Sequence, residues 1–129
     1  MPRLGLQRIP FTADADNRLR MLKARTGITP NVLCRIGFCL SLGEHGIPAA
    51  PQPDTRAGRE INRYTLLGGH DAAFLALLTA RLIQDGNGLP EQLDVAFLGH
   101  VNRGIEMLAA RVKSLSDLGE LIPSRKAQK

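Results

Sequence analysis

The chain has 129 residues, 43% of them hydrophobic, which is enough to bury one core in a single domain over residues 1–129. Its aromatic content of 4% argues against recognition of single strands by stacking many bases, and no apolar run is long enough to span a membrane. The net charge of +5 divides into +5 over residues 1–43, −3 over 44–110 and +3 over 111–129, which favours a polyanion, above all nucleic acid, as the partner.

A short strand or extended arm is predicted over residues 3–11, where apolar and polar residues alternate loosely until Pro10. Thr12 is a favourable N-cap, and the helix that follows it should end at Thr26, before the C-terminal stop provided by Gly27. This helix has a narrow apolar stripe and is otherwise strongly basic. Its apolar positions are Ala15, Leu19 and Leu22, its bordering cations are Arg18, Arg25 and Lys23, and Arg20 points away from the stripe.

A second helix is predicted over residues 30–42, because Thr29 is a good N-cap and Pro30 suits the first helical position. It is apolar on nearly every side, with Arg35 as its only charge, so more than one neighbour should bury it. A strand, a basic helix and an apolar helix in this order form the layout of a ribbon-helix-helix module, in which two chains pair their strands and second helices. The alternative is an ordinary helical hairpin within one core. The oligomer interface expected from the first layout contains Leu33, Ile36 and Leu40.

The remainder of the chain is expected to be helical after a Pro- and Gly-rich loop over residues 43–58. A helix over residues 71–84 should place Phe74, Leu77, Leu78 and Leu82 inward and end at the turn sequence DGNG. A longer helix should begin at Pro90, and Ser116 should cap a short turn that reaches Leu121. The predicted inward positions of the long helix are Leu93, Phe97, Val101, Gly104, Ile105, Leu108 and Val112. The fold expected is therefore mainly α, with two further helices after the ribbon-helix-helix-like part and a disordered basic tail over residues 123–129.

Residues suited to covalent or metal chemistry are few and dispersed. Cys34 and Cys39 have a spacing that fits neither a redox nor a metal motif, so we expect small buried hydrophobes in a reducing compartment. His45, His70 and His100 are scattered, which argues against a metal site. The chain lacks the G-x-x-x-x-G-K-[ST] order of a nucleotide-binding loop, and two cysteines are too few for an iron-sulfur cluster, so we expect no cofactor.

Tyr64 is the one residue that could cut a DNA strand covalently. It lies in the segment REINRYTLLGGH, between Arg59, Arg63 and His70, and arginines near a tyrosine could stabilise a phosphoryl transition state. The competing interpretation, which we prefer, is a half-buried tyrosine whose hydroxyl is hydrogen-bonded at a helix end. The N-terminus also lacks the apolar segment of a signal peptide, so we expect a cytoplasmic protein.

Three segments, LKARTG, TPNVLCRIGF and REINRYTLLG, are long and unusual in combination. With them the chain resembles the DndE family of small DNA sulfur modification proteins over roughly residues 10–118. The resemblance implies a helical fold related to ribbon-helix-helix proteins, a homo-oligomer that is a tetramer, and binding to double-stranded DNA, nicked DNA in particular. It also implies partners in DNA phosphorothioation: a cysteine desulfurase or its substitute, an iron-sulfur protein and an ATPase.

The predicted DNA contacts follow partly from this resemblance and partly from charge. Lys23, in LKARTG, is carried over from the family, whereas the other basic residues are chosen by position and charge. The complete predicted set is Lys23, Arg18, Arg20, Arg25, Arg8 and Arg3, with Thr29 and Asn31 at a helix N-terminus that could anchor phosphate. We therefore expect a non-catalytic DNA-binding subunit. The alternatives are a DNA-nicking enzyme that uses Tyr64 and an adaptor that binds only proteins.

Overall fold

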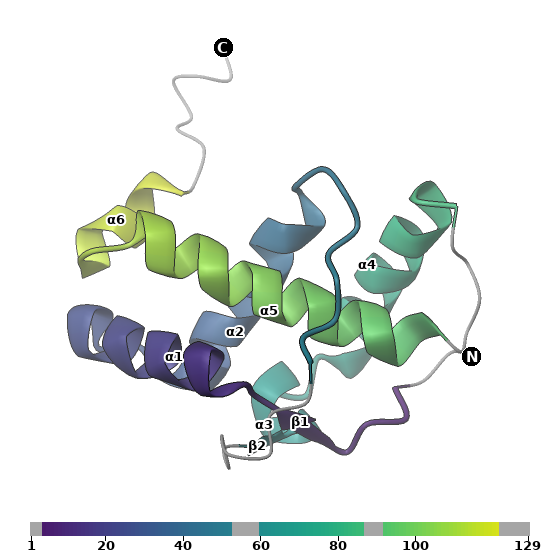
Figure 1. Ribbon diagram of the computed structural model, residues 1–129, viewed down its shortest axis with the longest axis horizontal. Coiled ribbons are helices and arrows are strands. Elements are labelled where there is room, and N and C mark those ends of the chain that lie inside the picture. Colours follow the sequence, from purple (N-terminus) through teal and green to yellow (C-terminus); the bar gives the residue numbers. More distant parts are fainter. Residues whose placement is uncertain (1–3, 53–59, 87–91, 122–129) are drawn as a thin grey trace.

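The computed structural model describes residues 4–52, 60–86 and 92–121, and within them it is mainly helical (Figure 1). Two short strands form an antiparallel ribbon, and α5 lies across the middle of the molecule with α1, α2 and α4 packed around it. In chain order the elements are β1 (Arg8–Pro10), α1 (Ala13–Thr26), α2 (Pro30–Leu42), β2 (Glu60–Asn62), α3 (Arg63–Leu67), α4 (Asp71–Gln84), α5 (Leu93–Arg111) and α6 (Leu115–Glu120).

The bounds of α1 agree with the prediction because its end signals are local. The Thr12 hydroxyl oxygen accepts a hydrogen bond from the Ala15 N–H at 3.1 Å, which caps the N-terminus. Gly27 has a φ of 76°, a left-handed conformation that glycine adopts without strain, and its N–H donates to the Lys23 carbonyl. The predicted apolar stripe of α1 is buried, which leaves the basic residues to the solvent side.

The closest packing in the core joins α2 to α5 at a pair of glycines. A Cβ atom placed on Gly104 would lie 2.2 Å from the carbonyl carbon of Gly37, so only glycine allows the two helices to approach this closely. The predicted inward face of α5 is confirmed, because its apolar side chains are all buried. Leu33 and Phe38 of α2 are buried in the same core. One face of α2 is therefore covered within the chain, without help from a second copy.

The ribbon differs from the expected layout. β1 pairs with β2 of the same chain, with Ile9 opposite Ile61, instead of pairing with the N-terminal strand of another copy. Ile9 is fully buried, so the short strand is fixed by core packing as well as by its ladder. Neither β2 nor α3 was predicted. The local signals for α3 are Asn62, whose side chain accepts from the Tyr64 N–H at 2.8 Å, and Gly68, whose φ is 62°.

Two details of the later helices also differ from the prediction. The bounds of α4 are those expected, but Leu77 is 50% exposed, so its inward assignment is wrong; Arg81 is buried in α4 instead. At α6 the cap residue is Ser114 rather than Ser116, and the Ser114 N–H donates to the Asp117 carboxylate at 3.2 Å.

Some predicted features lie wholly or partly outside the described residues. These are the start of the long helix at Pro90, residues 53–58 of the loop over residues 43–58 and the tail over residues 123–129. The described part of that loop contains no helix or strand. No helix among the described residues is both long and apolar enough to cross a membrane.

Candidate nucleic-acid interface

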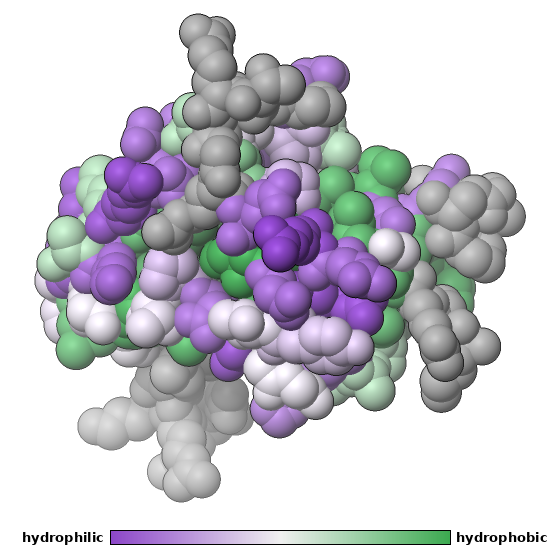
Figure 2. Space-filling view, turned by 90° about the horizontal axis from the view of Figure 1, so that it is seen from below, coloured by the Kyte–Doolittle hydropathy of each residue, from purple (hydrophilic) through white to green (hydrophobic). Residues whose placement is uncertain are grey.

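The solvent side of α1 carries four cations, Arg18, Arg20, Lys23 and Arg25, which we call the basic face. α1 lies on the lower side of the molecule in Figure 1, together with the ribbon and α3. Figure 2 shows this side, where hydrophilic residues predominate in the middle and apolar patches lie among them. The helix also contains two carboxylates, so its net charge is +2.

The cations of the basic face differ in their availability. Arg18 and Arg20 pair with carboxylates one turn earlier in the helix, Asp14 at 3.0 Å and Asp16 at 3.1 Å. The Arg18–Asp14 pair lies at the surface and contributes little energy, so a phosphate can compete for Arg18, whereas the Asp16 side chain is only 8% exposed and holds Arg20 more firmly. The Arg20 side chain is 67% exposed. Lys23 is exposed and, among the described residues, has no carboxylate within ion-pair distance.

Arg25 is the least accessible cation of the basic face. It is half-buried, and its Nη1 atom is enclosed without a hydrogen-bond acceptor in the described part of the chain. Lys23 and Arg25 lie in the last turn of α1, where cations stabilise the negative end of the helix dipole. Lys23 is therefore the cation best placed for an external anion, and Arg20 comes next because most of its side chain is exposed, although its guanidinium is paired with the buried Asp16.

The other predicted contacts have separate positions in the fold. Arg8 lies in the ribbon with its side chain 74% exposed and 3.7 Å from Glu60, whereas Arg3 lies outside the described residues. Thr29 is the N-cap residue of α2, but its side chain makes no capping hydrogen bond. The Asn31 amide donates to the Thr65 carbonyl at 3.3 Å, so it is engaged in holding α3.

Arg35 serves the same contact between α2 and α3. Its Nε atom donates to the Leu66 carbonyl at 2.6 Å and its Nη2 atom to the Thr65 carbonyl at 2.9 Å. These carbonyls belong to the last turn of α3, where a helix of only five residues has no backbone donors left for them. The single charge of α2 is therefore a structural cap for α3.

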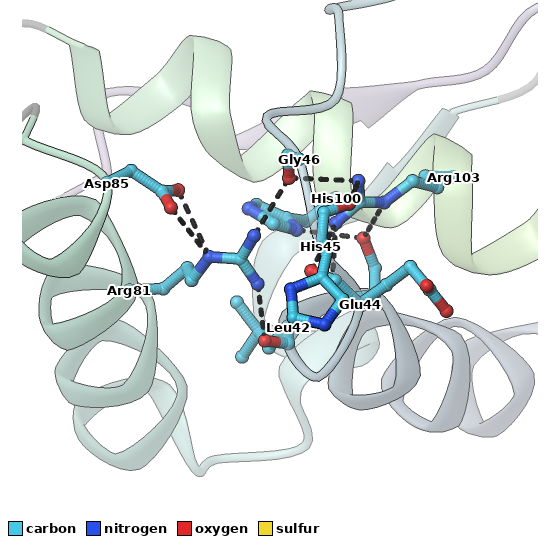
Figure 3. Close-up of polar contacts among 9 residues, drawn as sticks. Leu42, Glu44, His45, Gly46, Arg81, Asp85, His100 and Arg103 are labelled. Carbon is cyan, nitrogen blue, oxygen red and sulfur yellow. Dashed lines mark hydrogen bonds and ion pairs between the residues drawn. The ribbon is translucent and has the colours of Figure 1, made fainter.

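Two arginines, the buried Arg81 and the half-buried Arg103, hold the C-terminal end of α2, and we call them the arginine clamp (Figure 3). Arg81 is 9% exposed, and its Nε atom lies 3.0 and 3.1 Å from the two carboxylate oxygens of Asp85. Its two terminal nitrogens donate to the carbonyls of Leu42 and Gly46. All three guanidinium nitrogens are thus occupied within the fold.

Arg103 completes the clamp from α5. Its Nη2 atom donates to the Ser41 carbonyl at 2.7 Å, and its Nη1 atom donates to the carbonyls of His45 and Gly46 at 3.1 and 3.0 Å. Its Nε atom donates to the Ser41 hydroxyl oxygen at 2.8 Å. The clamp therefore satisfies the carbonyls at the end of α2 and in the turn that follows, which would otherwise lack donors.

His100 is buried beside this clamp, with its Nδ1 atom 2.8 Å from the Ser41 hydroxyl oxygen. Because the Arg103 Nε atom can only donate, the Ser41 oxygen accepts from it and its hydrogen is left for His100 Nδ1. Burial lowers the pKa of His100 to about 4, and the nearby charges of Arg103 and Arg81 act in the same direction. The ring is therefore neutral near pH 7.

The arginine clamp was not predicted from the sequence, although the sequence contains one signal for it. Arg81 is the only cation in α4 and lies between Leu78 and Leu82, on the apolar side of the helix, with Asp85 four residues later. A cation in such a position needs a buried partner, which the (i, i+4) carboxylate provides. Its carbonyl partners come from another part of the chain, and no local pattern indicates them.

The predicted oligomer contacts separate into two groups. Leu33 is fully buried in the core of the chain, so it is not accessible to another subunit. Ile36 and Leu40 remain partly exposed in an apolar groove of about 700 Å³ between α2, α4 and α6. This apolar groove is lined mainly by Ile28, Ile36, Leu40, Phe74, Leu118 and Leu121.

The two cysteines differ in their surroundings. Cys34 is buried as predicted, but Cys39 is exposed, so the expectation that both are buried is wrong. Cys39 lies on the wall of the apolar groove, where desolvation raises the pKa of its thiol.

Tyr64 has a different environment from the one predicted. Its side chain is 64% exposed, which contradicts the expected half-buried position, and its hydroxyl lies 3.5 Å from Arg63 Nη2. His70 is the N-cap residue of α4, and Arg59 lies outside the described residues. In the described part of the chain, no three His, Cys, Asp or Glu side chains are grouped as metal ligands.

Comparisons with known proteins agree with this fold and with the three sequence segments. The family model for the DNA sulphur modification protein DndE matches residues 8–116. The crystal structure of DndE from Escherichia coli B7A, involved in DNA phosphorothioation modification, superposes with a TM-score of 0.65 at 25% sequence identity, covering 85% of this chain and 100% of that one. A glycine-to-lysine double mutant of DndE gives a TM-score of 0.62 at 23% identity over 82% of this chain and 99% of that one. A comparison with curated protein sequences gives no match. The chain belongs to the DndE family of DNA sulphur modification proteins.

Proposed function

We propose that this chain is a non-catalytic subunit of the DNA phosphorothioation machinery that binds double-stranded DNA through the basic face of α1. The observation that carries the proposal is the contrast in availability among its cations. Lys23 and Arg20 are exposed on one helix, whereas Arg35, Arg81 and Arg103 donate to main-chain carbonyls. Membership of the DndE family supports DNA as the polyanion.

The contacts proposed are with phosphates rather than bases. An ammonium on a flexible side chain, such as that of Lys23, neutralises a phosphate without reading a base edge. Such binding is independent of DNA sequence. The logarithm of its association constant falls linearly with the logarithm of the salt concentration, with a slope of about −0.9 per phosphate neutralised. One helix with a net charge of +2 provides only a few such contacts. Useful affinity therefore requires several copies of the basic face.

A homotetramer would provide these copies, and two apolar surfaces support it. The first is the apolar groove, which contains Ile36 and Leu40. The second is the outer face of α4, which is exposed and carries no charge: Ala73, Ala76, Leu77, Ala80 and Ile83. Small side chains allow a second helix to approach closely, and two distinct self-complementary surfaces are what a tetramer with twofold symmetry requires.

Other proteins of the sulfur modification system complete the proposed assembly. The chemistry of replacing a phosphate oxygen with sulfur needs a sulfur donor and an activating nucleotide, which we assign to a cysteine desulfurase, an iron-sulfur protein and an ATPase. In this assignment the chain holds the duplex, with a preference for nicked DNA, in the cytoplasm.

The function is tested by the binding of a labelled duplex to matched variants. Lys23→Gln removes one charge from the basic face, and Gln52→Glu removes one unit of net charge at an exposed loop position. We expect Lys23→Gln to weaken binding to all duplex sequences and to reduce the salt slope by about 0.9, with Gln52→Glu close to the parent. A salt-independent interaction would favour the protein-only adaptor. Nicking of supercoiled plasmid with Mg²⁺, lost in Tyr64→Phe, would favour the enzyme.

The oligomer is tested at the apolar groove. Ile36→Asp places a carboxylate where a second copy is proposed to pack, and desolvating that charge costs several kcal/mol. We expect a lower mass by light scattering with an unchanged circular dichroism spectrum, and weaker DNA binding as a consequence. Ser116→Asp, at an exposed position of α6, is the control. A folded Ile36→Asp variant of unchanged mass would show that the subunits meet elsewhere.

A further inference from the structure

Tyr64 is the only exposed aromatic ring of the chain. Phe11, Phe38 and Phe97 are buried in the core, Phe74 is half-buried at the apolar groove, and the sequence contains no Trp and no second Tyr. A ring that is 64% exposed contributes little to the core, so the fold does not explain its position.

The position of Tyr64 is nevertheless well defined. Its backbone N–H donates to the Asn62 side chain at the start of α3. The Arg63 guanidinium lies over the ring, 5.2 Å from its centroid, and is itself fixed. Arg63 Nη1 donates to the Leu4 carbonyl at 2.8 Å, and Arg63 Nε lies 3.4 Å from the Asp71 carboxylate. The ring is therefore presented to solvent beside a cation that cannot move away.

A second, more available cation lies close by in the ribbon. Arg8 is paired in register with Asn62, the residue that caps α3 two positions before Tyr64. Its side chain is 74% exposed, and its contact with Glu60, at 3.7 Å, is long. The strand register thus places the backbone of Arg8 beside the start of α3, and an exposed guanidinium and an exposed ring in one region can bind an unpaired nucleotide, the ring stacking on the base and the cation contacting the phosphate.

We propose that Tyr64 stacks on a base exposed at an interruption of the duplex, such as a gap or a frayed end at a nick, with Arg8 on the adjacent phosphate. This inference rests on the DNA-binding function proposed above. In an intact duplex both faces of each base are covered by neighbouring bases, so a surface ring has nothing to stack on. At an interruption one face becomes available. The low aromatic content of the chain excludes a long single-strand platform but leaves one ring for one base.

The chain offers a direct probe of this contact, because Tyr64 is its single tyrosine and tryptophan is absent. Tyrosine emission therefore reports on residue 64 alone. We expect the tyrosine fluorescence lifetime to shorten when the protein binds a duplex with a one-nucleotide gap, and to stay unchanged on an intact duplex of the same sequence. A shortened lifetime on both duplexes, or on neither although both bind, would overturn the inference.

Affinity measurements give the second arm of the test. Tyr64→Ala should weaken binding to the gapped duplex by about 5- to 150-fold, the contribution of one base stacked on an aromatic ring, while Tyr64→Phe keeps the parental affinity. Both variants should bind the intact duplex as the parent does. Equal losses on the two duplexes would overturn the stacking role and leave the DNA-binding function in place. Failure of the parent to bind any duplex would overturn the proposed function and this inference with it.

Discussion

The basic face of α1 and the arginine clamp at the end of α2 carry the same kind of charge in opposite circumstances. On α1, Lys23 and Arg20 are exposed, and within the described part of the chain their ion-pair partner is Asp16 of the same helix, which pairs with Arg20. In the clamp, Arg81 and Arg103 donate to the carbonyls of residues 41–46 from two other helices. The number of basic residues in the sequence therefore does not give the number of DNA contacts, because several of these residues stabilise the fold.

The choice of side chain agrees with this difference. A guanidinium carries five N–H donors in a rigid plane, so Arg103 can satisfy several carbonyls and a hydroxyl at once. An ammonium is a strongly hydrated point charge on a flexible chain, and Lys23, as the lysine of the basic face, is suited to a mobile contact with phosphate. The comparison predicts that damage to the clamp changes stability and damage to the basic face changes binding.

The largest effect is expected from breaking the clamp. Arg81→Met should lower the free energy of unfolding by about 3–5 kcal/mol, because it removes the ion pair from the Asp85 carboxylate, which is only 14% exposed, and removes donors from two carbonyls. Urea denaturation at a fixed protein concentration measures the change. Arg111→Met is the control, since Arg111 lies 3.6 Å from Glu44 with both side chains about half exposed, and should cost at most about 1 kcal/mol. Equal losses in the two variants would contradict a specific role for the clamp.

Reversing charge on the basic face should have the next largest effect, and that effect is mainly on binding. Lys23→Glu combined with Arg20→Glu should weaken duplex binding by at least about 100-fold at low salt, since two phosphate contacts become repulsions. The oligomer mass should change little, because both side chains are exposed; the Tm should fall, because Arg20→Glu replaces the ion pair of the buried Asp16 carboxylate by a repulsion, so binding is measured well below the Tm. Anisotropy titrations and light scattering measure the two quantities. Normal binding by the double variant would indicate that DNA binds other cations, either Arg8 in the ribbon or those of the C-terminal tail.

The buried histidine makes the stability of the clamp region depend on pH. The pKa of His100 is about 4 in the fold and near 6.5 in the unfolded chain, so the unfolded state takes up the proton first as the pH falls. The stability that is complete above pH 6.5 should therefore decrease by about 2 kcal/mol between pH 7 and pH 4.5. Carboxylates titrate in the same range, so the test compares the parent with His100→Gln. The parent should lose more unfolding free energy than His100→Gln as the pH falls. Equal losses in the two proteins would show that His100 is already protonated in the fold.

Replacing Arg103 by a lysine separates charge from hydrogen-bond geometry within the clamp. Arg103→Lys keeps the charge but removes the planar set of donors that reaches Ser41, His45 and Gly46. We expect a loss of about 1–2 kcal/mol in the free energy of unfolding, as carbonyls at the end of α2 lose their donors. DNA binding by the folded protein should be unchanged. An unaltered denaturation midpoint would show that charge alone is sufficient at this position.

How far the sequence predicts this molecule depends on whether the signals are local. The bounds of α1 and α2 are confirmed because Thr12, Gly27 and Pro30 act on their immediate neighbours, and α4 ends as predicted at the turn that contains Gly86, with a φ of 83°. The ribbon partner of β1 was not predicted, because a three-residue strand is specified by pairing with a distant segment. The exposed cations of α1 follow from the helical period, whereas the partners of Arg81 depend on where the end of α2 meets α4 in space.

The smallest effect is expected from the reciprocal exchange, Lys23→Arg, and it is the sharpest test of the comparison. If the basic face binds phosphate by charge, an arginine at position 23 should leave the affinity for every duplex within about twofold and the salt slope unchanged, because one cation still displaces one counterion. The same exchange of side-chain type at position 103 is expected to cost stability, so the two substitutions are matched in chemistry and differ only in place. A gain of tenfold or more with Lys23→Arg, seen with one duplex sequence and not with others, would mean that the arginine grips a guanine edge through two donors. In that case position 23 lies in the major groove, and the contact made by α1 is a reading of bases rather than a grip on the backbone.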